Sequence, residues 1–175
     1  LLEDLLTYSR VGRQHHELEW VDIAALIRGL RHVLVAPADF RIELHVPLPV
    51  LHTERVPLET ILRNLIGNAI KHHDRPGEGV VEVSATEHGE WVEFAIKDNG
   101  PGIAPQHHER IFQIFQRLRP HDELEGSGMG LAIAKKAVES HGGVLQVESQ
   151  PGQGATFRFT WPRDASPTGS AGDLP

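Results

Sequence analysis

Between Pro57 and His72 the sequence carries a broad stripe of apolar residues at helical spacing, the feature that most strongly constrains the fold. The stripe recurs at intervals of three and four residues, the period of one face of an α-helix. Its members are Leu58, Ile61, Leu62, Leu65, Ile66 and Ala69. Pro57 suits the first turn of such a helix, because the N–H that it lacks would have no partner there. A face this wide has to be covered by a second layer of secondary structure.

The rest of the chain supplies candidates for that layer. Alternating apolar residues bounded by Gly and Pro predict strands over 41–46, 80–85, 91–97, 144–148 and 155–161. Helical periodicity predicts a helix over 22–34 with Asp22 as its N-cap, another over 129–140, and a short amphipathic helix at 111–115. Helices and strands do not alternate strictly. We therefore expect an α+β fold, a two-layer sandwich of a mixed five-stranded sheet with three main helices on one face.

The two ends of the chain differ from this central part. Residues 1–16 carry a helical apolar stripe that is too short to be buried alone, so we expect this helix to pack on a partner. Residues 163–175 are rich in Pro, Ser, Gly, Ala and Asp and are expected to form a disordered tail. A chain of 175 residues suits one domain, which we place at 17–162.

Composition argues against several classes of function. The 24 acidic and 17 basic residues give a net charge of -7, whereas nucleic-acid binding usually requires a basic surplus. The sequence has no apolar run of membrane-spanning length, so no membrane contact is expected for this segment. Without a signal-peptide pattern, a cytoplasmic location is expected. The chain has no cysteine, which excludes disulfides, thiol nucleophiles and thiolate metal sites.

Three polar side chains share one face of the predicted 57–72 helix. Asn64, Asn68 and Lys71 are spaced by four and three residues, which groups them at the edge of the apolar stripe. An amide oxygen can bind Mg²⁺ and an ammonium group can bind phosphate, so this face suits a metal–polyphosphate ligand. An ordinary solvated helix face would look the same, and the motif alone leaves both interpretations open.

Three segments rich in glycine accompany other predicted elements. Asp98-Asn99-Gly100-Pro101-Gly102-Ile103 follows a predicted strand, and Gly154-Ala155-Thr156-Phe157 opens another, although each is also typical of a simple turn. Gly126-Ser127-Gly128-Met129-Gly130-Leu131 opens a predicted helix, whose N-terminal N–H groups and dipole attract phosphate. A charged loop rather than a strand precedes it and no Gly-Lys-Ser/Thr follows, which excludes the Rossmann fingerprint and the P-loop.

Taken in this order, the segments resemble the catalytic, ATP-binding domain of sensor histidine kinases, in the GHKL superfamily. The resemblance covers residues 20–162 and includes every box of that domain. The N box corresponds to 64–71, the G1 box to 98–103, the F box to 112–115, the G2 box to 126–131 and the closing motif to 154–157. The resemblance implies a Bergerat-type fold. Residues 1–10 and 68–74 are similar to phytochrome-like and PAS-linked kinases.

The resemblance implies roles for individual residues. Asp98 accepts a hydrogen bond from the adenine amine, Asn68 holds Mg²⁺, and Lys71 with Arg117 or Arg119 neutralises phosphate charge beneath a lid at 104–127. The expected catalytic residues are Asn64, Lys71 and Arg117. The expected ATP-binding residues are Asn68, Lys71, Asp98, Gly100, Gly102, Ile103, Gly126, Gly128, Met129, Gly130, Leu131 and Thr156, the last through a water molecule.

The implied activity is that of a protein histidine kinase, which transfers the γ-phosphoryl group of ATP to a histidine on a separate dimerisation hairpin. Residues 1–16 resemble the end of that hairpin without its acceptor, because the residues after His16 lack the basic residue and the Pro of the acceptor motif. The implied partners are the hairpin in a homodimer, a response-regulator receiver domain, and an upstream sensor module of phytochrome or PAS type.

Two alternative functions stay open. One is an ATPase switch of the same superfamily, and the other is a nucleotide-binding regulatory domain of a sensor that acts mainly as a phosphatase. The ATPase switches carry a Glu as the base for water at the position of Asn64, and an amide cannot take a proton at neutral pH.

Overall fold

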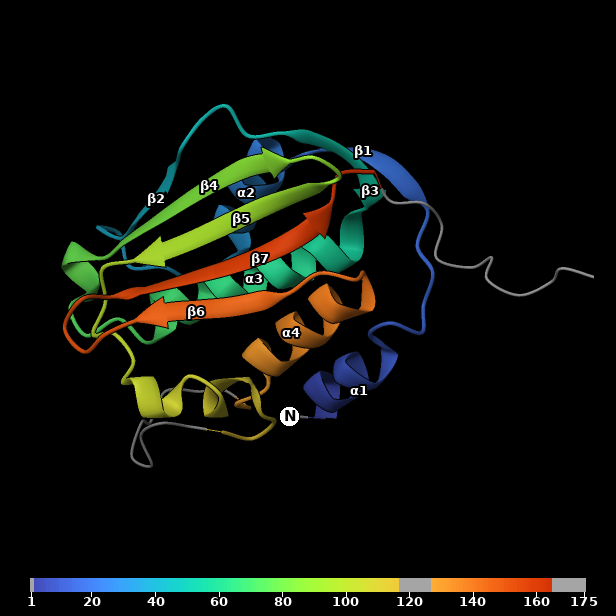
Figure 1. Cartoon of the computed structure of the whole chain (residues 1–175). Coiled ribbons are helices and arrows are strands. Elements are labelled where there is room, and N and C mark those ends of the chain that lie inside the picture. The colour runs from blue at the N-terminus through green and yellow to red at the C-terminus, as the bar shows by residue number, and fades with distance from the viewer. Residues whose placement is uncertain (1, 117–126, 165–175) are drawn as a thin grey trace, which may run out of the picture.

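The computed structural model describes residues 2–116 and 127–164 and consists of a five-stranded sheet with helices packed on one face (Figure 1). The strand order is β2 (Arg41–Leu44), β4 (Val80–His88), β5 (Trp91–Asp98), β7 (Ala155–Pro162) and β6 (Leu145–Ser149). The β2–β4 pair is parallel and the other pairs are antiparallel. The predicted mixed sheet is therefore confirmed.

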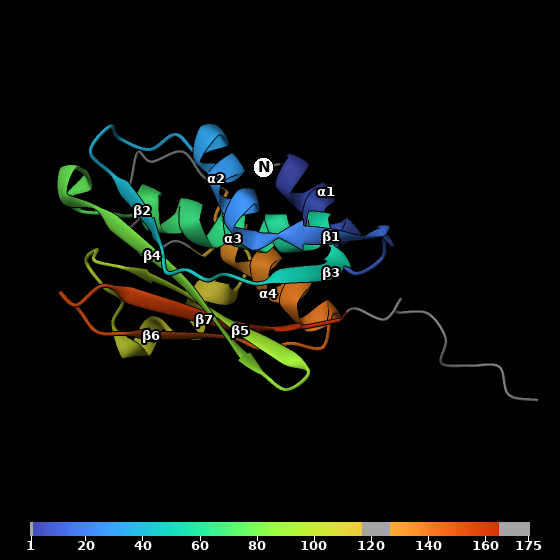
Figure 2. The same ribbon diagram turned by 90° about the horizontal axis from the view of Figure 1, so that it is seen from above.

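Three main helices form the second layer, which confirms the predicted α+β sandwich (Figure 2). They are α2 (Ile23–Val33), α3 (Arg55–Lys71) and α4 (Gly130–Ser140). The apolar stripe of α3 is buried along its whole length, with Leu58, Ile61 and Leu65 fully buried. The sheet contributes Phe94 and Phe159, whose rings stack with centroids 4.9 Å apart. Burial of the stripe between the layers is the main source of stability for this arrangement.

Several predicted boundaries agree with the structure. Asp22 caps α2, because its Oδ1 accepts a hydrogen bond from the N–H of Ala25 at 3.0 Å. Helix α3 begins at Arg55, which leaves Pro57 in its first turn as predicted.

Other elements differ from their predicted form. The strand expected over 41–46 ends at Leu44. The short helix expected at 111–115 is instead a 3₁₀ turn, η3 (Arg110–Phe112), and further 3₁₀ turns occur at η1 (Pro76–Glu78) and η2 (Pro105–His107).

A second, two-stranded antiparallel sheet consists of β1 (Leu18–Asp22) and β3 (Val50–Glu54), which were not predicted from the sequence. A buried hydrogen bond joins this small sheet to the large one, because Nε1 of Trp161 donates to Oγ1 of Thr53 at 2.9 Å. The small sheet is thus part of the same folded unit as the five-stranded sheet.

The two ends of the domain differ in detail from the expected segments. Helix α1 (Leu2–Arg10) ends at Arg10 rather than at residue 16 and packs beside α4 (Figure 1). There, Nζ of Lys136 donates a hydrogen bond to the carbonyl oxygen of Tyr8 at 2.7 Å. The folded region continues beyond 162, because the N–H of Arg163 donates to the carbonyl oxygen of Glu90 at 2.8 Å. The remainder of the expected tail, 165–175, lies outside the described residues. Among the described helices, none is long and apolar enough to cross a membrane.

Candidate functional site

A pocket of about 490 Å³ lies where α3, the start of α4, and the ends of β5 and β7 meet. Its size is typical of small-molecule sites. One part of its wall is apolar and the other is polar. The apolar side chains include Ile103, Ile111, Leu131 and Phe157, and the polar ones include Asn64, Asn68, Lys71 and Asp98. The four motif segments, which are distant in the sequence, therefore contribute to one cavity.

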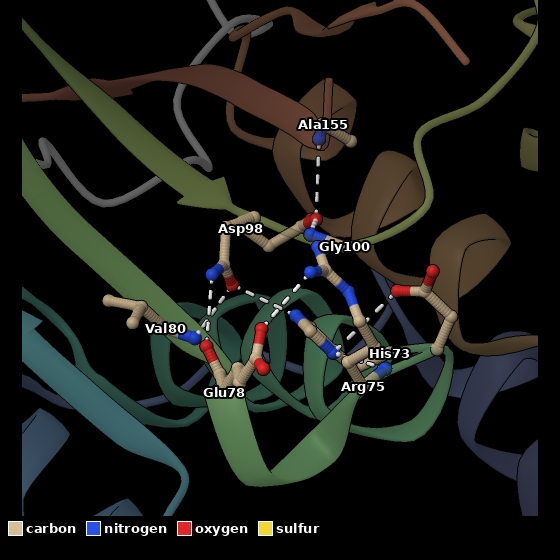
Figure 3. A network of polar contacts seen from close by, with 9 residues as sticks. His73, Arg75, Glu78, Val80, Asp98, Gly100 and Ala155 are labelled. Atoms are coloured by element: carbon tan, nitrogen blue, oxygen red, sulfur yellow. Dashed lines mark hydrogen bonds and ion pairs between the residues drawn. The ribbon is translucent and has the colours of Figure 1, made fainter. Parts of the chain in front are cut away.

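Asp98 is the last residue of β5, and its carboxyl group is largely buried beside the apolar wall. Its Oδ1 accepts hydrogen bonds from the N–H groups of Gly100 at 2.9 Å and Ala155 at 3.3 Å (Figure 3). Its Oδ2 accepts no hydrogen bond from any residue of the ranges 2–116 and 127–164, so this oxygen is available to a ligand.

Burial raises the pKa of Asp98, because the ionised carboxylate is removed from water. The hydrogen bonds from the N–H groups of Gly100 and Ala155 oppose this rise only in part. A partly desolvated carboxylate with one uncommitted oxygen is a strong acceptor for a donor group of a bound molecule.

The two asparagines of α3 face the pocket in different ways. Nδ2 of Asn64 donates to the carbonyl oxygen of Thr60 at 2.9 Å, so this amide is turned onto its own helix. The side chain of Asn68 has no hydrogen-bond partner within the described part of the chain, and its amide oxygen can serve as a metal ligand. The residues present therefore fit an Mg²⁺ ion held at Asn68.

The start of α4 supplies a further polar surface. Gly130 and Leu131 line the pocket, and the N-cap residue Met129 makes no side-chain capping hydrogen bond. The N–H groups of the first turn and the positive end of the helix dipole therefore suit an anionic ligand such as phosphate. A Cβ on Gly130 would lie 2.9 Å from Oδ1 of Asn64, so glycine allows α4 to begin directly against α3.

Residues 53–165 match the family of histidine kinase-, DNA gyrase B-, and HSP90-like ATPases. This range contains α3, α4 and four of the five strands of the large sheet, all but β2. The chain belongs to this family.

The relatives of this ATPase domain are histidine kinases. The phytochrome-like protein Cph1 of Synechocystis sp. (strain ATCC 27184 / PCC 6803 / Kazusa) is 38% identical over 164 residues, which cover 93% of this chain and 22% of Cph1. The structure of full-length ShkA in complex with AMPPNP superposes with a TM-score of 0.78 and 31% identity, covering 95% of this chain and 36% of ShkA. The mycobacterial sensor histidine kinase MprB gives a TM-score of 0.70 with 32% identity, covering 85% of this chain and 99% of that one.

The present chain thus corresponds to the catalytic ATPase domain of histidine kinases. It spans 21% to 22% of the length of the cyanobacterial phytochrome relatives.

Most of the residues predicted from the motifs of this family line the pocket. They are Asn64, Asn68, Lys71, Asp98, Gly102, Ile103, Gly128, Gly130 and Leu131. Gly100 and Met129 lie behind the wall, where the N–H of Gly100 holds Asp98 and the side chain of Met129 is buried. Arg117, Arg119 and Gly126 lie outside the described residues, as does the part of the expected lid at 117–126.

The structure does not bring Thr156 to the pocket. Its neighbours Ala155 and Phe157 line the wall, and successive side chains of a strand point to opposite faces. Thr156 therefore lies on the other face of the sheet, in register with Lys97 of β5 and Glu148 of β6. The residue of this segment that lines the pocket is one position earlier, at Ala155.

Gly102 lines the pocket, but its conformation is set by contact within the protein. Its φ is +72°, and a Cβ there would overlap the carbonyl oxygen of Gln150 in the turn between β6 and β7. Glycine therefore allows the segment after β5 to pack onto that turn.

Several residues of the wall were not predicted from the sequence. They include Asp4, Arg63, His72, His73, Asp74, Ile111, Gln116, Ala155 and Phe157. Ile111 and Phe157 belong to predicted apolar patterns, so the sequence contained a signal for their burial. Asp4 lies on α1, and the sequence around it has no feature that points to the pocket.

Proposed function

We propose that this domain binds ATP together with Mg²⁺ and transfers the γ-phosphoryl group to a histidine on a dimerisation hairpin of the same protein. The observation that carries the proposal is the buried carboxylate of Asp98, which offers an uncommitted oxygen beside an apolar wall. The opposite side of the pocket supplies Asn68, Lys71 and the start of α4.

At the apolar end, Oδ2 of Asp98 would accept a hydrogen bond from the exocyclic amine of adenine. Guanine carries a carbonyl oxygen at that position, so two acceptors would face each other and GTP would bind far more weakly. The side chains of Ile103, Ile111 and Phe157 would contact the faces and edge of the base.

At the polar end, Asn68 would hold Mg²⁺ and Lys71 would neutralise phosphate charge, with Arg117 as a further cation. Mg²⁺ supplies charge stabilisation for the triphosphate when it is bound. The N–H groups at the start of α4 would bind phosphate oxygens. Asn64 would orient the reacting groups rather than remove a proton, because its amide cannot act as a base.

In the reaction, the acceptor imidazole attacks the γ-phosphorus, the bond from phosphorus to the β–γ bridging oxygen breaks, and ADP leaves. The nucleophile comes from the hairpin, so this domain contributes positioning and charge neutralisation. The lack of a base at Asn64 favours this reaction over that of an ATPase switch, in which water is the nucleophile.

The wider context belongs to the same proposal. The similarity to phytochrome-like kinases supports a homodimer with an upstream phytochrome or PAS sensor module, a response-regulator receiver domain as the next phosphoryl acceptor, and a cytoplasmic location where ATP is available. Residues 1–16 would be the end of the dimerisation hairpin. A predominantly phosphatase sensor would use the same nucleotide site.

Two measurements test the proposal. Calorimetry should show binding of Mg²⁺-ATP with at least about 100-fold preference over Mg²⁺-GTP, and equal affinities would contradict the assignment of Asp98. With γ-labelled ATP, acid-labile label should appear on an added hairpin that carries the acceptor histidine and not on the chain itself. Label on the isolated chain would contradict the assignment of the acceptor to a separate segment.

A further inference from the structure

His73 lies just beyond the end of α3, and its imidazole is completely buried. Nδ1 of the ring accepts a hydrogen bond from the N–H of Arg75 at 3.0 Å (Figure 3). Nε2 lies 2.9 Å from Oδ1 of Asn99. A backbone N–H can only donate, so Nδ1 carries no proton. The ring is therefore neutral with its proton on Nε2, which donates to Asn99.

Asn99 is held by hydrogen bonds to Nε2 of His73 and to residues 78–80, at the start of β4. Its Oδ1 also accepts a hydrogen bond from the N–H of Val80 at 2.8 Å, and its Nδ2 donates to the carbonyl oxygen of Glu78 at 3.0 Å. Its own N–H faces the carbonyl oxygen of Val80 at 3.3 Å. These contacts fix the backbone of Asn99 between Asp98 and Gly100.

The anchoring of Asn99 bears directly on the Asp98 carboxylate. The N–H that Gly100 donates to Oδ1 of Asp98 belongs to the peptide bond formed by Asn99 and Gly100, so the direction of this donor follows the backbone of Asn99. A Cβ on Gly100 would lie 2.9 Å from Oδ1 of Asp98 and 3.5 Å from Cδ2 of His73, which places the three residues in close contact. The ring of Phe40 packs edge-on against the imidazole of His73, with the two ring centroids 5.6 Å apart, and holds the plane of the imidazole.

We infer that His73, acting through Asn99, is a positioning residue that orients the Asp98 carboxylate for selection of the base. The inference rests on the proposed role of Asp98 in binding adenine. His73 lines the pocket, but both of its ring nitrogens are occupied by protein partners. It therefore acts on the base through Asp98 and not by a hydrogen bond of its own.

Two substitutions separate the two hydrogen bonds of the ring. The amide nitrogen of Gln can reach the position of Nε2, so His73→Gln retains a donor for Asn99 and loses the acceptor for Arg75. The shorter Asn places its amide near Nδ1, so His73→Asn retains the acceptor for Arg75 and loses the donor for Asn99. If the contact with Asn99 orients Asp98, only His73→Asn weakens selection of the base.

The experiment compares ATP with purine riboside triphosphate, which lacks the exocyclic amine, by calorimetry in the presence of Mg²⁺. The wild-type chain should prefer ATP by about tenfold or more, since an unpaired buried acceptor weakens binding by at least that factor. His73→Asn should reduce this preference about fivefold, and His73→Gln should keep it within about twofold. General loosening of the domain would weaken both nucleotides equally and leave their ratio unchanged.

Asp98→Asn separates failure of this inference from failure of the proposed function. If Asp98→Asn abolishes the preference and His73→Asn leaves it intact, the role of His73 is overturned and that of Asp98 stands. A preference that survives Asp98→Asn overturns both. Should His73→Asn not fold, nitrogen-15 NMR of the wild-type chain decides the point: the ring should carry its proton on Nε2, and a proton on Nδ1 would overturn the inference.

Discussion

The imidazole of His141, which ends α4, lies against the carboxylate of Glu54, which precedes α3, with Nε2 2.7 Å from Oε2. Nδ1 of the same ring lies 2.9 Å from the carbonyl oxygen of Ala137. Both neighbours are acceptors, so the ring satisfies them only when both nitrogens carry protons. Oε1 of Glu54 also accepts a hydrogen bond from the N–H of His16 at 3.0 Å, which ties the segment after α1 to both helices.

This pair leads to a prediction about stability and pH. Burial acts to raise the pKa of Glu54, but the hydrogen bonds and charges of His141 and His16 outweigh it, and the net pKa lies below the ordinary value of 4.5. The stabilisation from ionised Glu54 is thus present above pH 4.5 and is lost as the pH falls through the lowered pKa. Glu54→Gln should reduce the free energy of unfolding at pH 7 by about 1.5–3 kcal/mol.

Urea denaturation over a pH series measures the effect. The difference between wild type and Glu54→Gln should narrow below pH 4.5, and a constant difference down to pH 3 would contradict the assignment. Glu59→Gln is the matched control, because Glu59 forms an exposed pair with Arg55 and its loss should cost less than about 0.5 kcal/mol.

Asp98→Asn should weaken ATP binding without unfolding the domain. The amide oxygen of Asn can still accept from Gly100 and Ala155, so both backbone donors remain satisfied. Because the pKa of Asp98 is raised, wild type loses stability as the pH rises from the ordinary value of 3.8 through the raised pKa, and the variant should lack this loss. At pH 7 the variant should therefore be at least as stable as wild type.

Thermal denaturation and calorimetry on the same preparations check this expectation. Asp39→Asn serves as a control, since Asp39 is exposed and lies outside the pocket wall. A large drop in the melting temperature of Asp98→Asn alone would mean that the carboxylate is needed for folding, and the loss of binding could then not be assigned to the base.

Asn68→Ala should remove the dependence of ATP affinity on Mg²⁺. The proposed metal ligand is its amide oxygen, which is free of other described partners. In wild type, Mg²⁺ should increase ATP affinity about tenfold or more, and in the variant about twofold or less. Adenosine, which has no phosphate, should bind both proteins equally. Gln146→Ala, at an exposed position of β6, should behave as wild type.

Lys136→Met should release α1 from the domain. Lys136 donates to the carbonyl oxygen of Tyr8 and lies 4.2 Å from the centroid of its ring, so the substitution removes a hydrogen bond and a cation–π contact. Amide exchange over residues 2–10 should accelerate about tenfold, while exchange within α3 stays unchanged. Lys135→Met is the control, because Lys135 contacts Phe112 and Glu139 instead. Equal acceleration in both variants would contradict a specific role for Lys136.

The elements that could be predicted from the sequence are those with a strong local period. The stripe of α3 extends over several turns, and β5 and β7 alternate clearly, so helix, strands and core face all follow from spacing. Strands β1 and β3 are only five residues each and pair across an intervening helix and strand. Their pairing depends on tertiary contacts such as Thr53 with Trp161, which no local pattern records.

The residues of the site likewise divide into those that local motifs predict and those that only the tertiary fold brings together. The motif residues of α3, the segment after β5 and the start of α4 meet in the pocket as expected. Thr156 was misplaced because a shift of one residue along a strand moves a side chain to the opposite face. His73 belongs to a pair of histidines with no metal-site spacing, and its partner Asn99 lies 26 residues further along the chain. Only the folded chain brings that donor and acceptor together.

The two hydrogen bonds that both converge on Oδ1 of Asp98 have a consequence for inhibitor chemistry. Because the remaining oxygen lies beside the apolar wall, a flat ring system with one adjacent N–H donor contains the groups needed to occupy this half of the pocket. Such a fragment needs no negative charge, so its affinity should not depend on Mg²⁺ or ionic strength. Fragment screening against the chain in EDTA would select for this half alone, and the hits could then be extended toward Asn68 and Lys71.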